Sequence, residues 1–156
     1  MSQTTLIYII CSVIATMFMT GFMYLASGVI NKNMYVVKIL SKMLFSLKSH
    51  KPLGVASRKQ LFVGWVLHYM IGMYFGIAYP FLAGFLNIYT NQDLIIAFVI
   101  GCIYGAAGVA GWATFFALHP APDQTVERKP YLLFIFIAHV VFAFTLYAST
   151  QLIKVG

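Results

Sequence analysis

Charged residues divide the chain into four long apolar stretches. No Lys, Arg, Asp or Glu occurs within Thr5–Ile30, Leu61–Leu86, Leu94–Leu118 or Tyr131–Ile153. Each stretch exceeds the roughly 20 residues that a helix needs to cross the hydrocarbon core of a bilayer. The stretches lack the alternation of a barrel strand, and in hydrocarbon only helices and closed barrels satisfy their backbone. We therefore predict an all-α integral membrane protein with four transmembrane helices in a single domain, residues 1–156.

The first two stretches carry local signals of their own. No Lys or Arg precedes Thr5–Ile30, and its apolar run is longer than the roughly 7–15 residues of a signal-peptide core, so we expect a retained helix. Pro80 interrupts the second stretch after Leu61–Tyr79, which already spans about 28 Å at 1.5 Å per residue. Because proline removes a helix hydrogen bond, we predict a kink at Pro80 near the far interface.

The basic residues predict an orientation. Seven Lys and Arg and no acid lie between the first two stretches, and Arg128 and Lys129 lie between the last two. The opposite side has only Lys154. This asymmetry is a positive-inside signal. We expect the cell inner membrane, with both chain ends outside and the first and third loops in the cytoplasm.

The lengths of the connections predict the packing. Asn87–Asp93 is a short external link, and His119–Pro130 is a short internal link rich in proline. Short links place consecutive helices side by side and antiparallel. The expected architecture is therefore an antiparallel up-down bundle of four helices.

The long first loop predicts a fifth helix. At 100° per residue, Met34–Ser49 gathers lysines and serines on one arc and aliphatic residues on the other, the pattern of an amphipathic helix lying in the cytoplasmic interface. Lys38, Lys42 and Lys48 are then expected to contact anionic lipid headgroups. The alternative is a docking surface for a partner helix.

Composition excludes several classes of protein. Hydrophobic residues make up 62% and charged residues 8%, against about 25% charged residues in a soluble domain. A soluble globular protein, a disordered chain and a nucleic-acid binder are therefore excluded despite the net charge of +7. The chain has no phosphate-binding glycine loop, serine nucleophile elbow or HExxH motif, and no carboxylate within a stretch. We expect no catalytic residues of these kinds.

Small residues recur at helical spacing on three of the stretches. Five glycines allow close helix approach; they are Gly72, Gly76, Gly101, Gly105 and Gly108. Ser12, Thr16 and Thr20 recur every four residues. We expect these hydroxyls to bond backbone carbonyls of the preceding turn rather than to line a polar track.

Two histidines fall at equal depth. His68 lies in the second stretch and His139 in the fourth, each followed four residues later by a small residue, and His119 ends the third stretch on the same side. His68 and His139 are candidate axial ligands of haem b. With His119 and Asp123 or Glu127 they are alternatively candidates for a transition-metal site. Otherwise each neutral imidazole bonds a Tyr or Thr hydroxyl of a neighbouring helix.

Three functions remain open on these patterns. The first is a non-catalytic accessory or assembly subunit of a larger membrane complex, which works through helix packing and lipid contacts, without a cofactor and with a membrane-protein partner or a second copy of itself. The alternative is a membrane redox protein that binds haem b or a transition metal through His68 and His139. The third is a small-solute transporter or channel that acts as an oligomer. The sequence identifies no substrate and no partner complex.

Overall fold

The computed structural model describes the whole chain except residues 1–2, 48–53, 90–91, 121 and 156. The described residues form helices and no strand. In chain order the helices are α1 (Gln3–Ile30), α2 (Val36–Ser46), α3 (Arg58–Leu86), α4 (Asp93–Leu118) and α5 (Arg128–Val155). All but α2 are long and apolar enough to cross a membrane. The prediction of an all-helical chain with four such helices is therefore confirmed.

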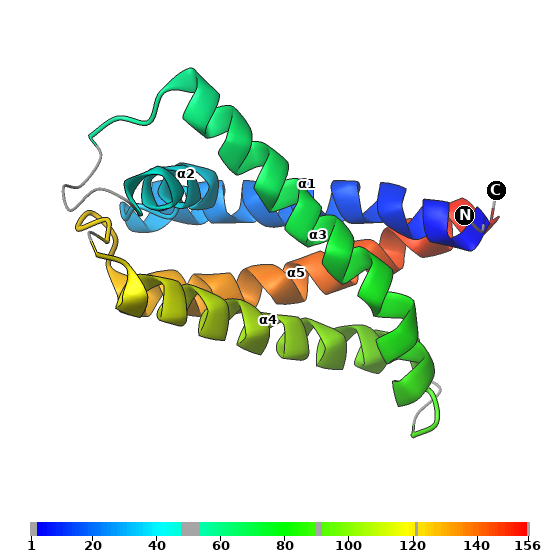
Figure 1. The fold of residues 1–156 in the computed structure, drawn as a ribbon. Coiled ribbons are helices and arrows are strands. Elements are labelled where there is room, and N and C mark those ends of the chain that lie inside the picture. The colour runs from blue at the N-terminus through cyan, green and yellow to red at the C-terminus, as the bar shows by residue number, and fades with distance from the viewer. Residues whose placement is uncertain (1–2, 48–53, 90–91, 121, 156) are drawn as a thin grey trace.

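The start of α3 shows why the long helices extend beyond the apolar stretches. Ser57 precedes the helix, and its Oγ accepts a hydrogen bond from the Gln60 backbone N–H at 3.4 Å while the Gln60 Oε1 accepts from the Ser57 N–H at 2.7 Å. This reciprocal capping box satisfies two backbone donors at the helix end. The helix then continues through Pro80 to Leu86 and bends over its last turns (Figure 1).

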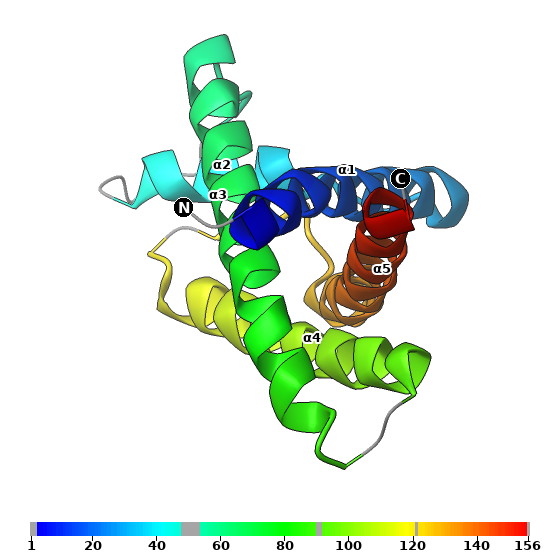
Figure 2. The same cartoon turned by 90° about the vertical axis from the view of Figure 1, so that its right-hand side faces the viewer.

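Helix α5 packs on both α1 and α4, whereas α3 packs mainly on α1 and α2. Helix α5 lies between α1 and α4, and α3 crosses over α1 (Figures 1 and 2). Both chain ends lie at one end of the molecule, the terminal end, and α2 lies at the other, the α2 end. The short link at Asn87 does not make α3 and α4 close neighbours along their length, which corrects that part of the prediction. Helix α3 packs mainly on α1 and α2 because its glycines admit their side chains.

Helix α2 is shorter and more enclosed than its sequence pattern predicts. It runs across the direction of the long helices (Figure 1). Ser41 and Ser46 of its polar arc are buried instead of solvated, since Ser41 packs against Gly64 of α3 and Ser46 lies 3.3 Å from the His119 Nε2. The last residues of the predicted helix, which include Lys48, lie outside the described residues.

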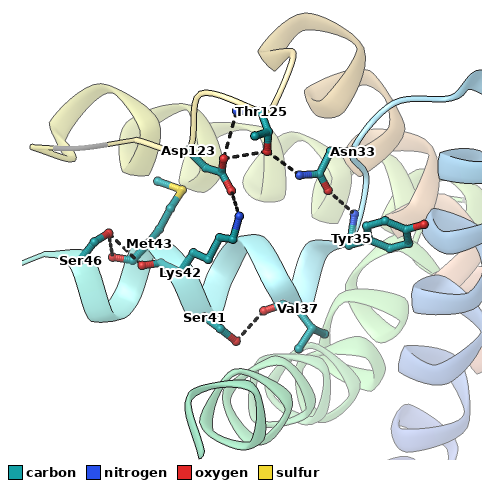
Figure 3. A network of polar contacts seen from close by, with 9 residues as sticks. All are labelled: Asn33, Tyr35, Val37, Ser41, Lys42, Met43, Ser46, Asp123 and Thr125. Carbon is teal, nitrogen blue, oxygen red and sulfur yellow. Dashed lines mark hydrogen bonds and ion pairs between the residues drawn. The ribbon is translucent and has the colours of Figure 1, made fainter. Parts of the chain in front are cut away.

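Polar contacts join α2 and the loop before it to the link between α4 and α5. Lys42 Nζ lies 3.3 Å from Asp123 Oδ2, and the Asn33 amide donates to Thr125 Oγ1 at 2.7 Å (Figure 3). Lys32 and Glu127 form a second, more exposed ion pair at 2.6 Å. Lys42 is therefore bound to a carboxylate of its own chain, while Lys38 lies over the Tyr35 ring at 4.4 Å.

Asp123 is expected to make stability pH-dependent. Burial raises the pKa of its carboxyl, but hydrogen bonds from Thr125 and the Lys42 ammonium together hold that pKa below its ordinary value of 3.8. An acid with a lowered folded-state pKa stabilises the fold above its unfolded pKa, and this contribution disappears as the pH falls through the folded value. Asp123→Asn should lower the free energy of unfolding by about 1 kcal/mol at pH 7, and the difference from wild type should shrink as the pH falls below 3.8 and through the lowered folded-state pKa.

Thermal unfolding in mild detergent from pH 7 to pH 3 measures this difference. Glu127→Gln is the matched control, because the Glu127 side chain is 61% exposed against 8% for Asp123. An exposed pair contributes about 0–1 kcal/mol, so this control should stay near wild type. Equal losses in both variants, or a difference at Asp123 that does not shrink at low pH, would contradict the prediction.

Candidate functional site

A cavity of about 320 Å³ lies among all five helices. Its lining is mostly apolar, with methionines from α1, aliphatic residues from α2 and α5, and aromatic rings from α3, α4 and α5. Two polar side chains face it, His68 of α3 and His139 of α5. The structure therefore brings together the two histidines that the sequence places at equal depth.

The mouth of the cavity lies between α3 and α4. Among its lining residues, Ile71 of α3 and Ala107 and Gly111 of α4 are exposed. Next to them Met70 and Tyr74 are exposed as well. Because α3 diverges from α4, these residues leave an opening on the apolar outer surface of the helices. The cavity is thus accessible from the side, across an apolar rim.

His68 is held by a hydroxyl of α1. Its Nε2 lies 2.9 Å from Thr20 Oγ1, and the Thr20 hydroxyl donates its single proton to the Thr16 carbonyl at 2.7 Å. Nε2 is therefore the donor in the histidine–threonine bond, which leaves Nδ1 of the neutral ring as an acceptor. The expectation that a buried imidazole bonds a hydroxyl of a neighbouring helix is confirmed for His68, as is the expected bonding of the Thr16 and Thr20 hydroxyls to carbonyls four residues back.

His139 is held by its own helix. Its Nδ1 lies 2.7 Å from the Ile135 carbonyl oxygen, which only accepts, so Nδ1 carries the proton and Nε2 is left as an acceptor. The ring stands against Gly108 of α4, where an added Cβ would lie 2.9 Å from Nε2. On another side Phe75 meets the ring edge-on at 5.7 Å between centroids. These contacts fix the ring orientation at the cavity wall.

The acceptor nitrogens of both histidines reach open space. Neither has a hydrogen-bond partner among the described residues. Among the described residues, Tyr131 Oη is the single side-chain polar atom that is both fully buried and without a hydrogen-bond partner. The two histidine nitrogens have no partner among these residues either, so they are not fully buried. His68 Nδ1 and His139 Nε2 are therefore available to a molecule in the cavity. A lone pair of this kind takes either a hydrogen-bond donor or a metal ion.

His119 and the two acids occupy a different place. His119 Nε2 donates to the Met43 carbonyl at 2.6 Å, and His119 does not line the cavity. Asp123 and Glu127 pair with lysines at the α2 end. The described residues contain no group of three or more His, Cys, Asp or Glu arranged for a metal. The combination of His119, Asp123 or Glu127 with the deeper histidines is thus not assembled in this structure.

The five glycines that were predicted to allow close helix packing all face other helices of the same chain. On α3, an added Cβ at Gly72 would meet Thr16 and one at Gly76 would meet Ser12 of α1. On α4, Gly101 faces Val140, Gly105 faces Phe136 and Gly108 faces His139, all on α5. These five positions serve contacts within one copy of the chain. Leucine at Gly105 or Gly108 would therefore disturb the packing of α4 on α5 within the chain.

Several lining residues were not identified from the sequence. Phe75, Trp112 and Phe142 contribute the aromatic wall, and Met19 and Met23 contribute the α1 side. They lie in apolar runs where hydrophobic residues occur on all sides of the helix, so no periodic signal separates them from residues on the outer surface. The crossing of α3 over α1 selects them, and that crossing has no local sequence signature.

Comparison with known proteins gives no relative from which a role could be transferred. No family model, curated protein or solved structure matches the chain. What the cavity binds must therefore be inferred from its own side chains.

Proposed function

We propose that this chain is a multi-pass protein of the cell inner membrane that binds a small membrane-soluble molecule carrying aromatic hydroxyl groups, of the phenol or quinol type. The observation that supports this most strongly is that two neutral imidazoles present acceptor nitrogens to one apolar cavity. An apolar pocket with few polar groups is the usual form of a small-molecule site. The hydroxyls of a phenol or quinol donate, and its ring matches the aromatic lining.

The mouth between α3 and α4 supports the same class of ligand. In a bilayer it opens toward lipid, so a ligand dissolved in the membrane enters without crossing a charged surface. The volume of about 320 Å³ is near the lower end of the roughly 300–1,000 Å³ typical of ligand pockets. A single substituted ring is favoured over a larger molecule.

Calorimetric titration of the protein in nanodiscs tests the proposal. The probe is trimethylhydroquinone, and the matched control compound is its dimethyl ether, which keeps the ring but cannot donate a hydrogen bond. We expect saturable binding of the hydroquinone, after subtraction of empty nanodiscs, at least tenfold tighter than binding of the ether. Equal affinities for both, or no saturable binding, would refute the proposal.

Haem binding is a second candidate because of the hydrogen bond at His139. Metal-ligating histidines usually donate their other ring N–H to a carbonyl or carboxylate, as His139 Nδ1 does to Ile135. A macrocycle between His68 and His139 would, however, require Phe75 to leave the His139 ring. Absorption spectra of the purified protein before and after dithionite distinguish this candidate: a Soret band with reduced α-bands supports haem.

The orientation and the broader role are proposals as well. We propose that the termini lie outside and the α2 end in the cytoplasm, where the basic residues gather. The roles of accessory subunit and of transporter stay predictions. The glycines that suggested an accessory role are used within the chain. Small residues on one side of α4 are exposed in the described chain and could contact a partner helix. They are Ala106, Ala107, Ala110, Gly111 and Thr114.

A further inference from the structure

A second, smaller cavity of about 210 Å³ lies at the terminal end and differs in chemistry from the histidine cavity. It is formed by α1, α3, α4 and α5 together. The polar and aromatic residues that line it include Tyr8, Tyr79, Tyr147, Asp93, Asn87 and Gln151. Apart from Asp93, no lining residue is charged. The cavity therefore combines one carboxylate with three phenol rings.

The Asp93 carboxylate forms no ion pair with a described residue. The ion pairs of the described residues, Lys32 with Glu127 and Lys42 with Asp123, both lie at the α2 end. Asp93 stands in the first turn of α4, where the helix dipole favours a negative charge. The carboxylate next to the cavity is thus free to attract a cation.

The tyrosines present both rings and unpaired oxygens. Tyr8 and Tyr79 are buried, and their ring centroids are 6.2 Å apart with a tilt of 33°. Neither hydroxyl forms a hydrogen bond with a described residue. Among the described residues, Tyr131 Oη is the single polar side-chain atom that is fully buried without a partner, so the hydroxyls of Tyr8 and Tyr79 are not fully buried. Because both residues line the cavity, their hydroxyl oxygens are exposed to a ligand there.

We infer that this cavity binds a small organic ammonium ion, with Asp93 supplying the negative charge and Tyr8, Tyr79 and Tyr147 supplying aromatic and hydroxyl contacts. Ammonium groups bind over aromatic rings, and sites for quaternary ammonium are commonly aromatic cages. Calcium takes six to eight oxygen ligands, usually from several carboxylates, whereas one carboxylate lines this cavity. The volume lies below the usual range for drug-sized ligands, which restricts the ligand to a compact amine.

The two cavities share no lining residue. The Phe75 and Tyr104 rings pack at a tilt of 35° with their centroids 4.5 Å apart, and the Tyr104 hydroxyl donates to the Phe75 carbonyl at 2.7 Å. Phe75 lines the histidine cavity, and Tyr79, one turn further along α3, lines the other. The ammonium site therefore does not depend on what the histidine cavity binds.

Titration calorimetry with choline tests the inference on the full chain in nanodiscs. The comparison compound is 3,3-dimethyl-1-butanol, a neutral molecule of the same shape as choline. We expect saturable choline binding and at least tenfold weaker binding of the neutral compound. Asp93→Asn should weaken choline binding at least tenfold, and Tyr79→Phe should weaken it less because the ring remains. Glu127→Gln, which removes a carboxylate at the opposite end, should leave the affinity unchanged.

Each outcome decides the question. Absence of choline binding, or equal binding of the neutral compound, overturns the inference on wild-type protein alone, whatever the variants do. Competition by sodium or potassium at concentrations equal to that of choline identifies an inorganic cation site and also overturns it. An equal loss in Asp93→Asn and Glu127→Gln shows a general effect of charge and rejects the assignment to Asp93.

Discussion

Replacing Gly101 with alanine should lower the free energy of unfolding by about 1–3 kcal/mol, the usual cost of overpacking a tightly packed core. The added Cβ would lie 2.8 Å from the Val140 Cα and 3.3 Å from the Ala143 Cβ. The nearest atom belongs to the backbone of α5, so no side-chain rotation relieves the contact. Alanine is favoured over glycine in a helix interior by about 0.5–1 kcal/mol, which is too small to offset the clash. Unfolding in mixed micelles by titration with dodecyl sulfate measures the loss.

Gly111→Ala on the same helix is the matched control for Gly101→Ala. An added Cβ at Gly111 meets no atom within 4 Å, so only the helix preference for alanine remains. This variant should unfold like wild type or be more stable by up to about 1 kcal/mol. If both variants lose stability equally, or if Gly101→Ala loses none, the close packing of α4 on α5 at Gly101 is wrong.

The packing at Gly101 also bears on the histidine cavity. Val140 follows His139 directly, and the His139 carbonyl lies 3.5 Å from the position of the added Cβ. A shift of α5 that accommodates alanine would move the His139 ring away from Gly108. Stability and ligand binding are therefore expected to fall together in Gly101→Ala.

The four long helices could be predicted from the sequence because length and the absence of charge are local properties. The start of α3 is equally local, since Ser57 and Gln60 form its cap within one turn. The position of α3 in space is not local. A short link at Asn87 is compatible with α3 lying along α4 or leaning away from it. Helix α3 packs on α1 instead, because Gly72 fits against Thr16 and Gly76 fits against Ser12.

The candidate site could be predicted in part for the same reason. Residue counts from the helix ends place His68 and His139 at one depth, and the structure puts both on one cavity. Counting could not show which ring nitrogen stays free, because that depends on the Thr20 hydroxyl for His68 and on the Ile135 carbonyl for His139. The prediction of a solvated polar arc on α2 was wrong at Ser41 because burial there depends on a residue far away in the sequence. Gly64 of α3 faces Ser41 and leaves room for it.

Replacing His68 and His139 with phenylalanine should abolish most of the binding of trimethylhydroquinone. Each substitution keeps an aromatic ring of similar size and removes one acceptor. A single hydrogen bond contributes about 0.5–1.5 kcal/mol, so each variant should bind up to about tenfold more weakly. If the two bonds act independently, the double variant should lose up to about 100-fold. Calorimetry in nanodiscs measures all three affinities.

The design of these substitutions keeps the fold intact. When the imidazole of His68 is replaced by a phenyl ring, the Thr20 hydroxyl still donates to the Thr16 carbonyl. His68→Phe therefore leaves no buried hydrogen-bond donor without an acceptor. His119→Gln is the control, because His119 does not line the cavity and glutamine can still donate to the Met43 carbonyl. Its affinity should equal that of wild type. The dimethyl ether, which forms neither bond, should bind wild type and the double variant alike. A double variant that folds, with unchanged helicity, and still prefers the hydroquinone to the ether would show that the two imidazoles are not the acceptors.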